Sequence, residues 1–289
     1  MRTSIKVLLI TCAMALGLTG CLRGPKIQTT PAAGGDAGVK KIERIVSMAP
    51  SNTEIICALG AADRLVGVTA FCNYPEEATL KQKIGDFQIN REKVLELEPD
   101  LVVGISGQEG LAEELEQHGI RTIILNPADF DGTLTSILEM GEVLGAADRA
   151  AQIVEGMKAK REEVRAALVG AEPVSVLVVL DVEGLWTVGP GTFLHELIED
   201  AGGRNIAAAA NAPYLQLSIE TIVEENPDVI ILTLPGKEEL LAKPGFDMVK
   251  AVIDERVVEV NADVVSRPGP RLADGLYEIA RVLHPDRLK

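Results

Sequence analysis

The chain has 289 residues, of which 47% are hydrophobic, so it is long enough for two packed domains of about 100 to 150 residues each. Its formal charge is −15, and without the first 20 residues it carries 26 basic against 43 acidic residues, a charge of −17. This acidity argues against nucleic acid or an anionic membrane surface as a partner, and it leaves docking onto a basic protein surface open.

The amino terminus has the features of an export signal. Two basic residues precede an apolar stretch over residues 7–18, which is shorter than the ~20 residues that span a bilayer and typical of a secretory signal peptide. The Leu-Thr-Gly-Cys that follows is similar to a bacterial lipoprotein box ending at Cys21. We therefore predict a signal peptide over 1–20, a lipidated Cys21 and a flexible tether over 21–40. The exported protein would be held by its lipid at the outer face of the cytoplasmic membrane or in the periplasm.

Cys57 and Cys72 are the two cysteines that remain for the folded part of the exported chain. Both lie near the ends of one expected strand–helix–strand unit, and export places them where disulfides persist. A disulfide between them and two free thiols are equally compatible with the sequence.

A sixteen-residue pattern occurs twice in the chain. Residues 89–104, INREKVLELEPDLVVG, align without gaps with residues 217–232, LSIETIVEENPDVIIL. In each copy a helical segment ends before Pro, because the residue before Pro is disfavoured in the α region, and an apolar run of strand length follows. The identical aligned residues are Glu92 with Glu220, Glu96 with Glu224, Pro99 with Pro227 and Asp100 with Asp228. A unit that recurs in this way predicts two similar lobes.

Strand and helix patterns alternate on both sides of a long connector. In the first half we expect strands at 44–48, 65–69, 101–104 and 122–125, and helices at 53–59, 111–117 and 134–144. Ser51 or Asn52 would cap the first of these helices. In the second half we expect strands at 174–180 and 257–260, helices at 193–201, 247–253 and 271–283, and loops at 186–192, 211–216 and 261–270.

This alternation predicts an α/β fold with two Rossmann-like lobes, 41–146 and 170–289, each built on a mostly parallel sheet. The charged, Ala-rich stretch over 147–169 is longer than most helices and would join the lobes as a single interlobe helix.

Aromatic residues are scarce, with five Phe, three Tyr and one Trp, so their positions are informative. Ligands of open α/β sheets bind outside the carboxyl ends of the strands. Four aromatic residues, two from each half, lie in loops that we expect there: Phe71, Phe87, Trp186 and Tyr214. They predict aromatic walls for a large flat or apolar ligand. Tyr74, beside Pro75, is better explained as packing within its own loop.

Polar candidates come from the loop before the last helix. Asp263 and Arg267 are suited to hydrogen-bond an amide or carboxylate of the ligand. Arg271 belongs to the first turn of the last helix, where Asp274 or a loop carbonyl would be its partner.

Catalytic machinery and a resident metal or cofactor are not expected. The sequence has no G-x-S-x-G elbow and no phosphate-binding P-loop. Its three His show no metal-ligand spacing. His195 follows the loop 189–192, and the alternative for this residue is a role as axial ligand to a metal bound in the cleft.

Several parts of the chain resemble the class III periplasmic binding proteins. They are residues 44–77, RIVSMAPSNTEIICALGAADRLVGVTAFCNYPEE, both copies of the repeat, and the RPGPR at 267–271. These are the substrate-binding components of ABC importers for cobalamin, haem and ferric siderophores. The resemblance implies two α/β lobes joined by one long helix, a ligand between them and small lobe movements. It also implies that Glu92 and Glu220, one on each lobe, meet Arg residues of a permease dimer. The alternative is that both Glu merely complement the dipoles of their helices.

The closest similarity is to the cobalamin-binding branch, which implies ligand contacts at Phe71, Phe87, Trp186, Tyr214 and Asp263. Two of these are Phe, which lack a polar group, so haem and a ferric siderophore stay open as ligands. We therefore expect a monomeric, non-enzymatic lipoprotein that binds a corrinoid or another metal chelate. The alternative from a different class is a two-lobed tetrapyrrole chelatase. The export signal and the missing His–Glu metal constellation count against it.

Overall fold

The computed structural model describes residues 41–288, which lie within one compact unit formed by residues 37–289. The predicted signal peptide, the lipidated Cys21 and the tether fall outside the described residues. Of the helices within 41–288, none combines the length and the apolar character that crossing a bilayer requires.

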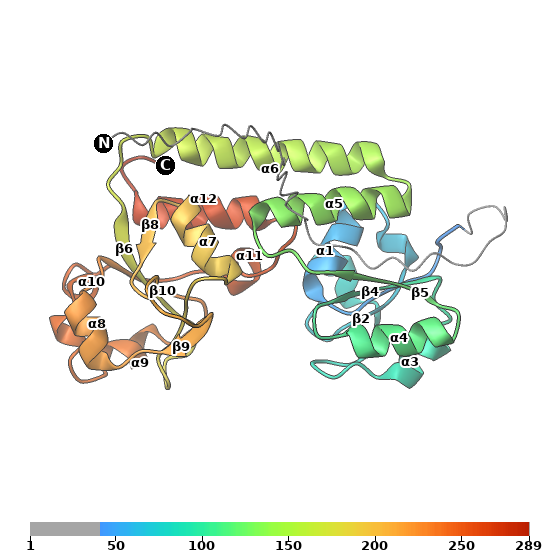
Figure 1. The fold of residues 1–289 in the computed structure, drawn as a ribbon, viewed down its shortest axis with the longest axis horizontal. Helices are drawn as coiled ribbons and strands as arrows, with labels where there is room; N and C mark the ends of the chain where they lie inside the picture. Colours follow the sequence, from blue (N-terminus) through green and yellow to red (C-terminus); the bar gives the residue numbers. More distant parts are fainter. Residues whose placement is uncertain (1–40, 289) are drawn as a thin grey trace, which may run out of the picture. The chain divides into compact units, whose positions relative to one another are not determined.

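The first lobe is built on a five-stranded parallel sheet with the order β3-β2-β1-β4-β5 (Figure 1). Its strands are β1 (Ile45–Ser47), β2 (Leu65–Val68), β3 (Gln82–Lys83), β4 (Leu101–Ile105) and β5 (Arg121–Leu125). Its helices are α1 (Pro50–Ala58), α2 (Glu76–Thr79), α3 (Arg91–Glu96), α4 (Glu109–Gln117) and α5 (Phe130–Leu144), with a 3₁₀ turn at Ala62–Arg64. The strand order reverses between β1 and β4, which is where a doubly wound sheet leaves a crevice.

The second lobe is built on a four-stranded parallel sheet with the order β11-β10-β6-β8. Its strands are β6 (Val174–Val179), β8 (Gly203–Asn205), β10 (Val229–Leu232) and β11 (Val257–Glu259), and a separate antiparallel ribbon pairs β7 (Trp186–Val188) with β9 (Tyr214–Gln216). Its helices are α7 (Phe193–Asp200), α8 (Ile219–Glu225), α9 (Lys237–Leu241), α10 (Lys250–Ile253), α11 (Ala262–Val265) and α12 (Leu272–Leu283), with a 3₁₀ turn at Phe246–Met248. The strand order of this sheet reverses between β6 and β10.

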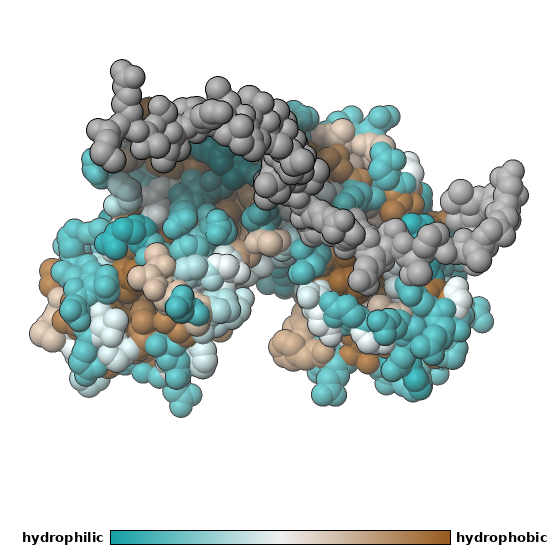
Figure 2. Space-filling view, viewed as in Figure 1, coloured by the Kyte–Doolittle hydropathy of each residue, from teal (hydrophilic) through white to brown (hydrophobic). Residues whose placement is uncertain are grey.

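The long connector is α6 (Ala147–Ala167), which packs on α5 of the first lobe and on α12 of the second. Figure 1 shows α6 running over both of these helices. On the side away from α6, Figure 2 shows the surface hollowed between the two lobes. The α/β class with two parallel sheets and one long interlobe helix is therefore confirmed.

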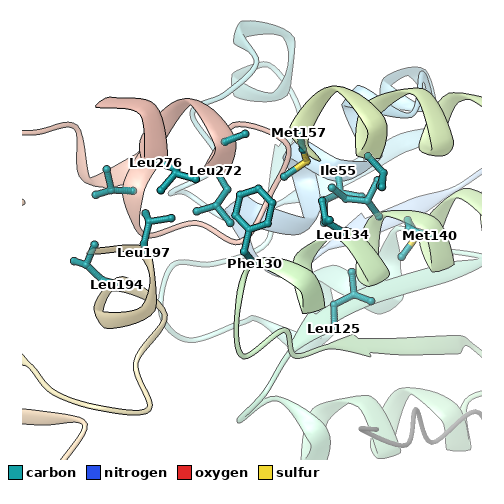
Figure 3. Close-up of a cluster of buried hydrophobic side chains, with 14 of the residues drawn as sticks. Ile55, Leu125, Phe130, Leu134, Met140, Met157, Leu194, Leu197, Leu272 and Leu276 are labelled. Atoms are coloured by element: carbon teal, nitrogen blue, oxygen red, sulfur yellow. The ribbon is translucent and has the colours of Figure 1, made fainter. Parts of the chain in front are cut away.

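The two lobes share one hydrophobic core beneath α6. Phe130 at the start of α5 is only 4% exposed, and in Figure 3 it lies between Leu272 of α12 and Leu134 of α5, with Met157 of α6 above it. The same buried cluster continues into both sheets through β-strand residues such as Ile45 and Val176. Separating the lobes would expose this apolar surface to water, so the layer of helices resists large interlobe movements.

The two copies of the repeat have the same backbone geometry. The first strand residue after each shared Pro-Asp is Leu101 of β4 or Val229 of β10. Leu101 pairs with Ile45 of β1, and Val229 pairs with Val176 of β6. Asp100 Oδ2 accepts hydrogen bonds from the backbone N–H groups of Glu43 and Arg44 at 3.0 Å each. These bonds hold the start of β1 against the start of β4.

The second copy repeats this anchor. Asp228 Oδ2 accepts a hydrogen bond from the N–H of Ser175 at 3.0 Å, at the start of β6. The residue before Pro is left-handed in both copies, with φ of 42° at Glu98 and 44° at Asn226. The helix-to-strand connection is thus a duplicated structural unit.

The sequence-based predictions differ from the structure where tertiary contacts decide. The loops expected at 186–192 and 211–216 contain β7 and β9, whose pairing depends on residues far apart in the chain. The helix expected at 247–253 is a 3₁₀ turn followed by α10.

Two predicted helix starts are also wrong. Ser51 and Asn52 do not cap α1, because the helix begins at Pro50, whose fixed φ suits the first helical position. The Asn52 amide instead donates to the Gly104 carbonyl at 2.9 Å. The helix α5 begins at Phe130 rather than 134, because Asp129 Oδ1 accepts a hydrogen bond from the N–H of Gly132 at 2.7 Å and caps it earlier.

Candidate functional site

A cavity of about 180 Å³ opens at the carboxyl ends of β1, β4 and β5, where the topology of the first sheet predicts a ligand. Polar residues that follow these strands line it, and the second lobe contributes Pro268. The polar lining residues are Ser51, Asn52, Ser106, Asn126 and Ser136. Sequence reasoning missed this cavity, although Ser106 and Asn126, each directly after an apolar strand, were a usable signal.

A larger cavity of about 350 Å³ lies among α5, α6 and α7 instead of at strand ends. Its lining is rich in carboxylates, and its guanidinium, Arg161, already bonds Asp131 at 2.9 Å and Asp200 at 2.7 Å. A cavity of this character is unsuited to a flat apolar ligand.

The first lobe exposes a pair of aromatic rings beside its strand ends. Phe71 follows β2 and Phe87 follows β3, and their ring centroids lie 4.5 Å apart at an interplanar angle of 51°. Phe71 is 40% exposed and Phe87 is 88% exposed. Apolar rings this accessible are available to a ligand.

The second lobe exposes its own aromatic pair on the β7–β9 ribbon. Trp186 pairs with Gln216 and Val188 with Tyr214, which places Trp186 and Tyr214 diagonally on one face. The Trp186 carbonyl accepts a hydrogen bond from the N–H of Leu180 at 2.8 Å, so the ribbon is attached at the carboxyl end of β6. Trp186 is 41% exposed and Tyr214 is 57% exposed. The structure thus brings the four predicted aromatic residues to the strand ends as one pair on each lobe.

Arg267 and Arg271 of the second lobe converge on Glu54 in α1 of the first. Arg267 Nη1 donates to Glu54 Oε1 at 3.0 Å, and Arg271 donates through Nη2 to Oε1 at 2.7 Å and through Nε to Oε2 at 2.8 Å. These hydrogen bonds to Glu54 raise the pKa of Arg271 above its ordinary value. The partner of Arg271 is therefore Glu54, and the expected partners, Asp274 or a loop carbonyl, are wrong.

Asp263 lies in the same network at its more exposed end. Its Oδ1 is 2.6 Å from Arg267 Nη2, and its Oδ2 accepts a hydrogen bond from Asn73 Nδ2 of the first lobe at 2.8 Å. Asn73 Oδ1 in turn accepts from Arg267 Nη1 at 2.8 Å. The structure places Asp263 and Arg267 together at the lobe border, and their contact with a ligand stays a prediction.

Tyr74 lies beneath the guanidinium of Arg271, with 3.9 Å between the guanidinium carbon and the ring centroid. This cation–π contact accounts for Tyr74 by packing, in line with the interpretation of its position beside Pro75.

Two of the three His are buried and bonded within the second lobe. His195 is buried in α7, with Nδ1 3.0 Å from Asn205 Nδ2 and Nε2 3.4 Å from Glu199. His284 is also buried and contacts the Gly202 carbonyl at 3.1 Å, and His118 ends α4. Within residues 41–288, no three His, Cys, Asp or Glu side chains are grouped so as to hold a metal ion.

Glu92 and Glu220 occupy the same position in two capped helices. Each is the second residue of its helix. Asn90 caps α3 by accepting a hydrogen bond from the N–H of Lys93 at 2.9 Å, and Ser218 caps α8 by accepting one from the N–H of Thr221 at 3.1 Å. Because α3 and α8 lead directly into β4 and β10, their N-termini point toward the carboxyl edges of the two sheets.

Both carboxylates are ionised and exposed. The backbone N–H of Glu92 and a hydrogen bond from Arg91 lower the pKa of Glu92. The backbone N–H of Glu220 and the Ser218 hydroxyl lower the pKa of Glu220. This geometry fits a pair of docking charges and equally fits charges that complement helix dipoles, so docking stays a prediction.

Cys57 and Cys72 are both free thiols, so the disulfide that the sequence left open is absent from the structure. Cys72 is buried, with Sγ 3.1 Å from Thr53 Oγ1 and 3.2 Å from Thr69 Oγ1. Burial, reinforced by the negative charge of Glu77, raises the pKa of Cys57 to about 12. At neutral pH this thiol is protonated and unreactive.

The periplasmic binding protein family model matches residues 45–264. An uncharacterized ABC transporter substrate-binding lipoprotein of Bacillus subtilis is 36% identical over 260 residues, covering 86% of this chain and 82% of that protein. A vitamin B12-binding protein of Vibrio campbellii is 27% identical over 254 residues, covering 86% of this chain and 91% of that protein.

Solved structures show the same architecture. The periplasmic vitamin B12-binding protein of Vibrio cholerae superposes with a TM-score of 0.77 at 26% identity, covering 86% of this chain and 99% of that one. A periplasmic heme-binding protein of Roseiflexus, in its apo form, also gives a TM-score of 0.77 at 26% identity, covering 84% and 98%.

Proposed function

We propose that this chain, which belongs to the periplasmic binding protein family, captures a corrinoid between its two lobes and delivers it to the permease of an ABC importer. An ABC transporter substrate-binding protein binds its solute and hands it over unchanged, so the chain is not an enzyme. Family membership removes the tetrapyrrole chelatase that the sequence left as an alternative.

The observation that carries the proposal is the pair of exposed aromatic residues on each lobe. Phe71 and Phe87 on one side and Trp186 and Tyr214 on the other offer flat apolar surfaces at the strand ends. A large flat ligand buries such rings without requiring a charged partner. Vitamin B12-binding relatives with the same fold support a corrinoid as that ligand.

The charges at the lobe border favour a corrinoid over an anionic chelate. Arg267 and Arg271 are bonded to Glu54, and Arg267 also to Asp263, so both cations are already neutralised. A ferric siderophore with several negative charges would need unpaired cations there.

The placement of the His residues argues against haem. A bound haem commonly takes His, Met, Tyr or Cys from the protein as its axial ligand. His195 and His284 are buried and bonded elsewhere, which leaves Tyr214 as the exposed candidate among the four aromatic residues of the site. A corrinoid brings the ligands of its own cobalt and makes no such demand.

The remaining parts of the proposal concern the partner and the membrane. Glu92 and Glu220 would meet basic residues on the two subunits of a permease dimer, one lobe to each subunit. Cys21 would carry the lipid that keeps the monomeric protein at the membrane, as the lipoprotein among its relatives supports.

Titration of the full-length protein with cyanocobalamin, haemin and a ferric tris-catecholate siderophore, which is an anionic chelate, tests the choice of ligand. The chain has one Trp, Trp186, so its fluorescence reports the site directly, and calorimetry gives affinity and stoichiometry. We expect one cyanocobalamin per chain with quenching of Trp186, and weaker or no binding of the others. Tighter binding of haemin, lost in a Tyr214→Phe variant, would instead establish a haem carrier.

A further inference from the structure

Glu54 is a carboxylate buried at the border of the two lobes. Its side chain is only 2% exposed, and the two guanidinium groups that bond it come from a segment more than 200 residues further along the chain. A buried carboxylate is costly unless it is paired and fully hydrogen-bonded, and both oxygens of Glu54 are bonded here. Removing this carboxylate would therefore leave Arg271 without its partner and Arg267 with Asp263 alone.

The arginines that bond Glu54 also bond the rim of the ligand site. Arg267 Nη2 lies 3.4 Å from the Phe71 carbonyl, and Arg267 Nη1 bonds Asn73 Oδ1 at 2.8 Å. Arg271 stacks on Tyr74 in the same loop. One network thus ties the segment 261–271 of the second lobe to the segment 71–74 of the first, which carries an aromatic residue of the proposed site.

We propose that Glu54 is a positioning residue: through Arg267 and Arg271 it clamps segment 261–271 onto segment 71–74 and keeps the two rims of the ligand site pre-formed. Asp263 and Phe71 are then oriented before the ligand arrives, so binding does not have to order these segments. The inference rests on the proposed function for the role of these rims, whereas the clamp itself can be observed without any ligand.

A second ion cluster between the lobes provides a matched control. Arg161 of α6 bonds Asp131 of the first lobe and Asp200 of the second, and its guanidinium lies 4.7 Å from the Phe130 ring centroid. Like the Glu54 cluster it joins the lobes through three charged side chains. Its residues lie on α5, α6 and α7, and none of these contacts involves segment 71–74 or 261–271.

Hydrogen–deuterium exchange of the ligand-free, full-length protein tests the clamp. In Glu54→Gln we expect exchange in both segments to rise about tenfold, because one network protects them, while β4 keeps its protection. Arg161→Met should leave both segments unchanged. Unchanged exchange of the segments in Glu54→Gln, or an equal rise in Arg161→Met, would overturn the proposal.

Two further measurements guard against a trivial result. If Glu54→Gln does not fold, Arg267→Met leaves Glu54 paired with Arg271 and should raise exchange in the same two segments.

The ligand-binding experiment compares the same variants. Glu54→Gln should weaken cyanocobalamin binding about tenfold or more, whereas Arg161→Met should not, and Glu54→Asp should restore part of the affinity. If the parent protein binds none of the three probes, the proposed function fails, and the exchange measurement still decides the clamp.

Discussion

The two lobes share a backbone unit and differ in almost everything attached to it. In both, an Asp after Pro accepts the N–H groups at the start of the neighbouring strand, and a left-handed residue precedes that Pro. The first lobe presents its aromatic pair on loops after β2 and β3, whereas the second presents it on an antiparallel ribbon. The unit that fixes the sheet is thus the same in both lobes, whereas the segments that carry the exposed aromatic pairs differ.

The two lobes also differ in what surrounds Glu92 and Glu220. Glu92 is bonded by Arg91 at 3.1 Å, and Arg91 also bonds Glu114 at 3.2 Å. Glu220 has the Ser218 hydroxyl as its neighbour in place of a cation. If both dock on one permease, the second lobe offers the less neutralised charge.

Reversing both charges should give the largest effect. In Glu92→Lys with Glu220→Lys we expect ligand uptake to fall at least about tenfold, because two complementary contacts become repulsive, while ligand affinity is retained. Of the single variants, Glu220→Lys should reduce uptake more. Glu155→Lys, which reverses an exposed charge on α6, serves as the control. Normal uptake by the double variant would show that both Glu only complement helix dipoles.

Removing the Asp anchor should destabilise both lobes similarly. Asp100→Ala leaves two backbone N–H groups at a strand start without their partner. Asp228→Ala leaves one such N–H group and the Lys250 ammonium without theirs, so we expect each variant to lower the free energy of unfolding by about 1–3 kcal/mol. Urea denaturation measures both. A large difference between the two variants would show that the anchor is not equivalent in the two lobes.

Acid should expose the contribution of Asp228. Although burial raises the pKa of this carboxyl, hydrogen bonds from Lys250 and the Ser175 N–H outweigh it and lower the pKa overall. A carboxyl whose pKa is lower in the folded state than in the unfolded state stabilises the fold at pH values above its unfolded pKa. This contribution is lost as the pH falls through the folded pKa. The stability difference between the parent and Asp228→Asn should therefore shrink as pH falls below about 4. A difference that stays constant from pH 7 to pH 3 would contradict this assignment.

The smallest effect comes from the residue before Pro. Asn tolerates the left-handed region better than Glu, so Glu98→Asn should stabilise the protein by about 0.5–1 kcal/mol. The reciprocal Asn226→Glu should destabilise it by about 1–2 kcal/mol, since it also removes the hydrogen bond that the Lys250 N–H donates to Asn226 Oδ1. Thermal unfolding of the two variants checks these opposite signs.

The parts of the fold that could be predicted are those encoded by local pattern. The apolar runs of β1, β4, β6 and β10 and the duplicated Pro-Asp are visible in the sequence, because buried parallel strands are continuously hydrophobic. The ribbon of β7 and β9 was missed because each strand has three residues and finds its partner more than 20 residues away.

The candidate site shows the same limit. The aromatic residues were found because they are rare and lie in loops. Glu54 was missed because one charge in an apolar helix gives no sign of partners 213 and 217 residues away. Long-range ion pairs depend on the assembled fold and leave no periodic signal in the chain.

The core beneath α6 also determines when this protein can finish folding. Phe130 and Met157 share this core with Leu272 and Leu276 of α12, which come after the whole first lobe in the chain. A nascent chain that lacks α12 therefore leaves those side chains facing water, even after the first sheet is complete. We therefore expect the two lobes to unfold as one cooperative unit, because the first lobe cannot complete its core before α12 is present.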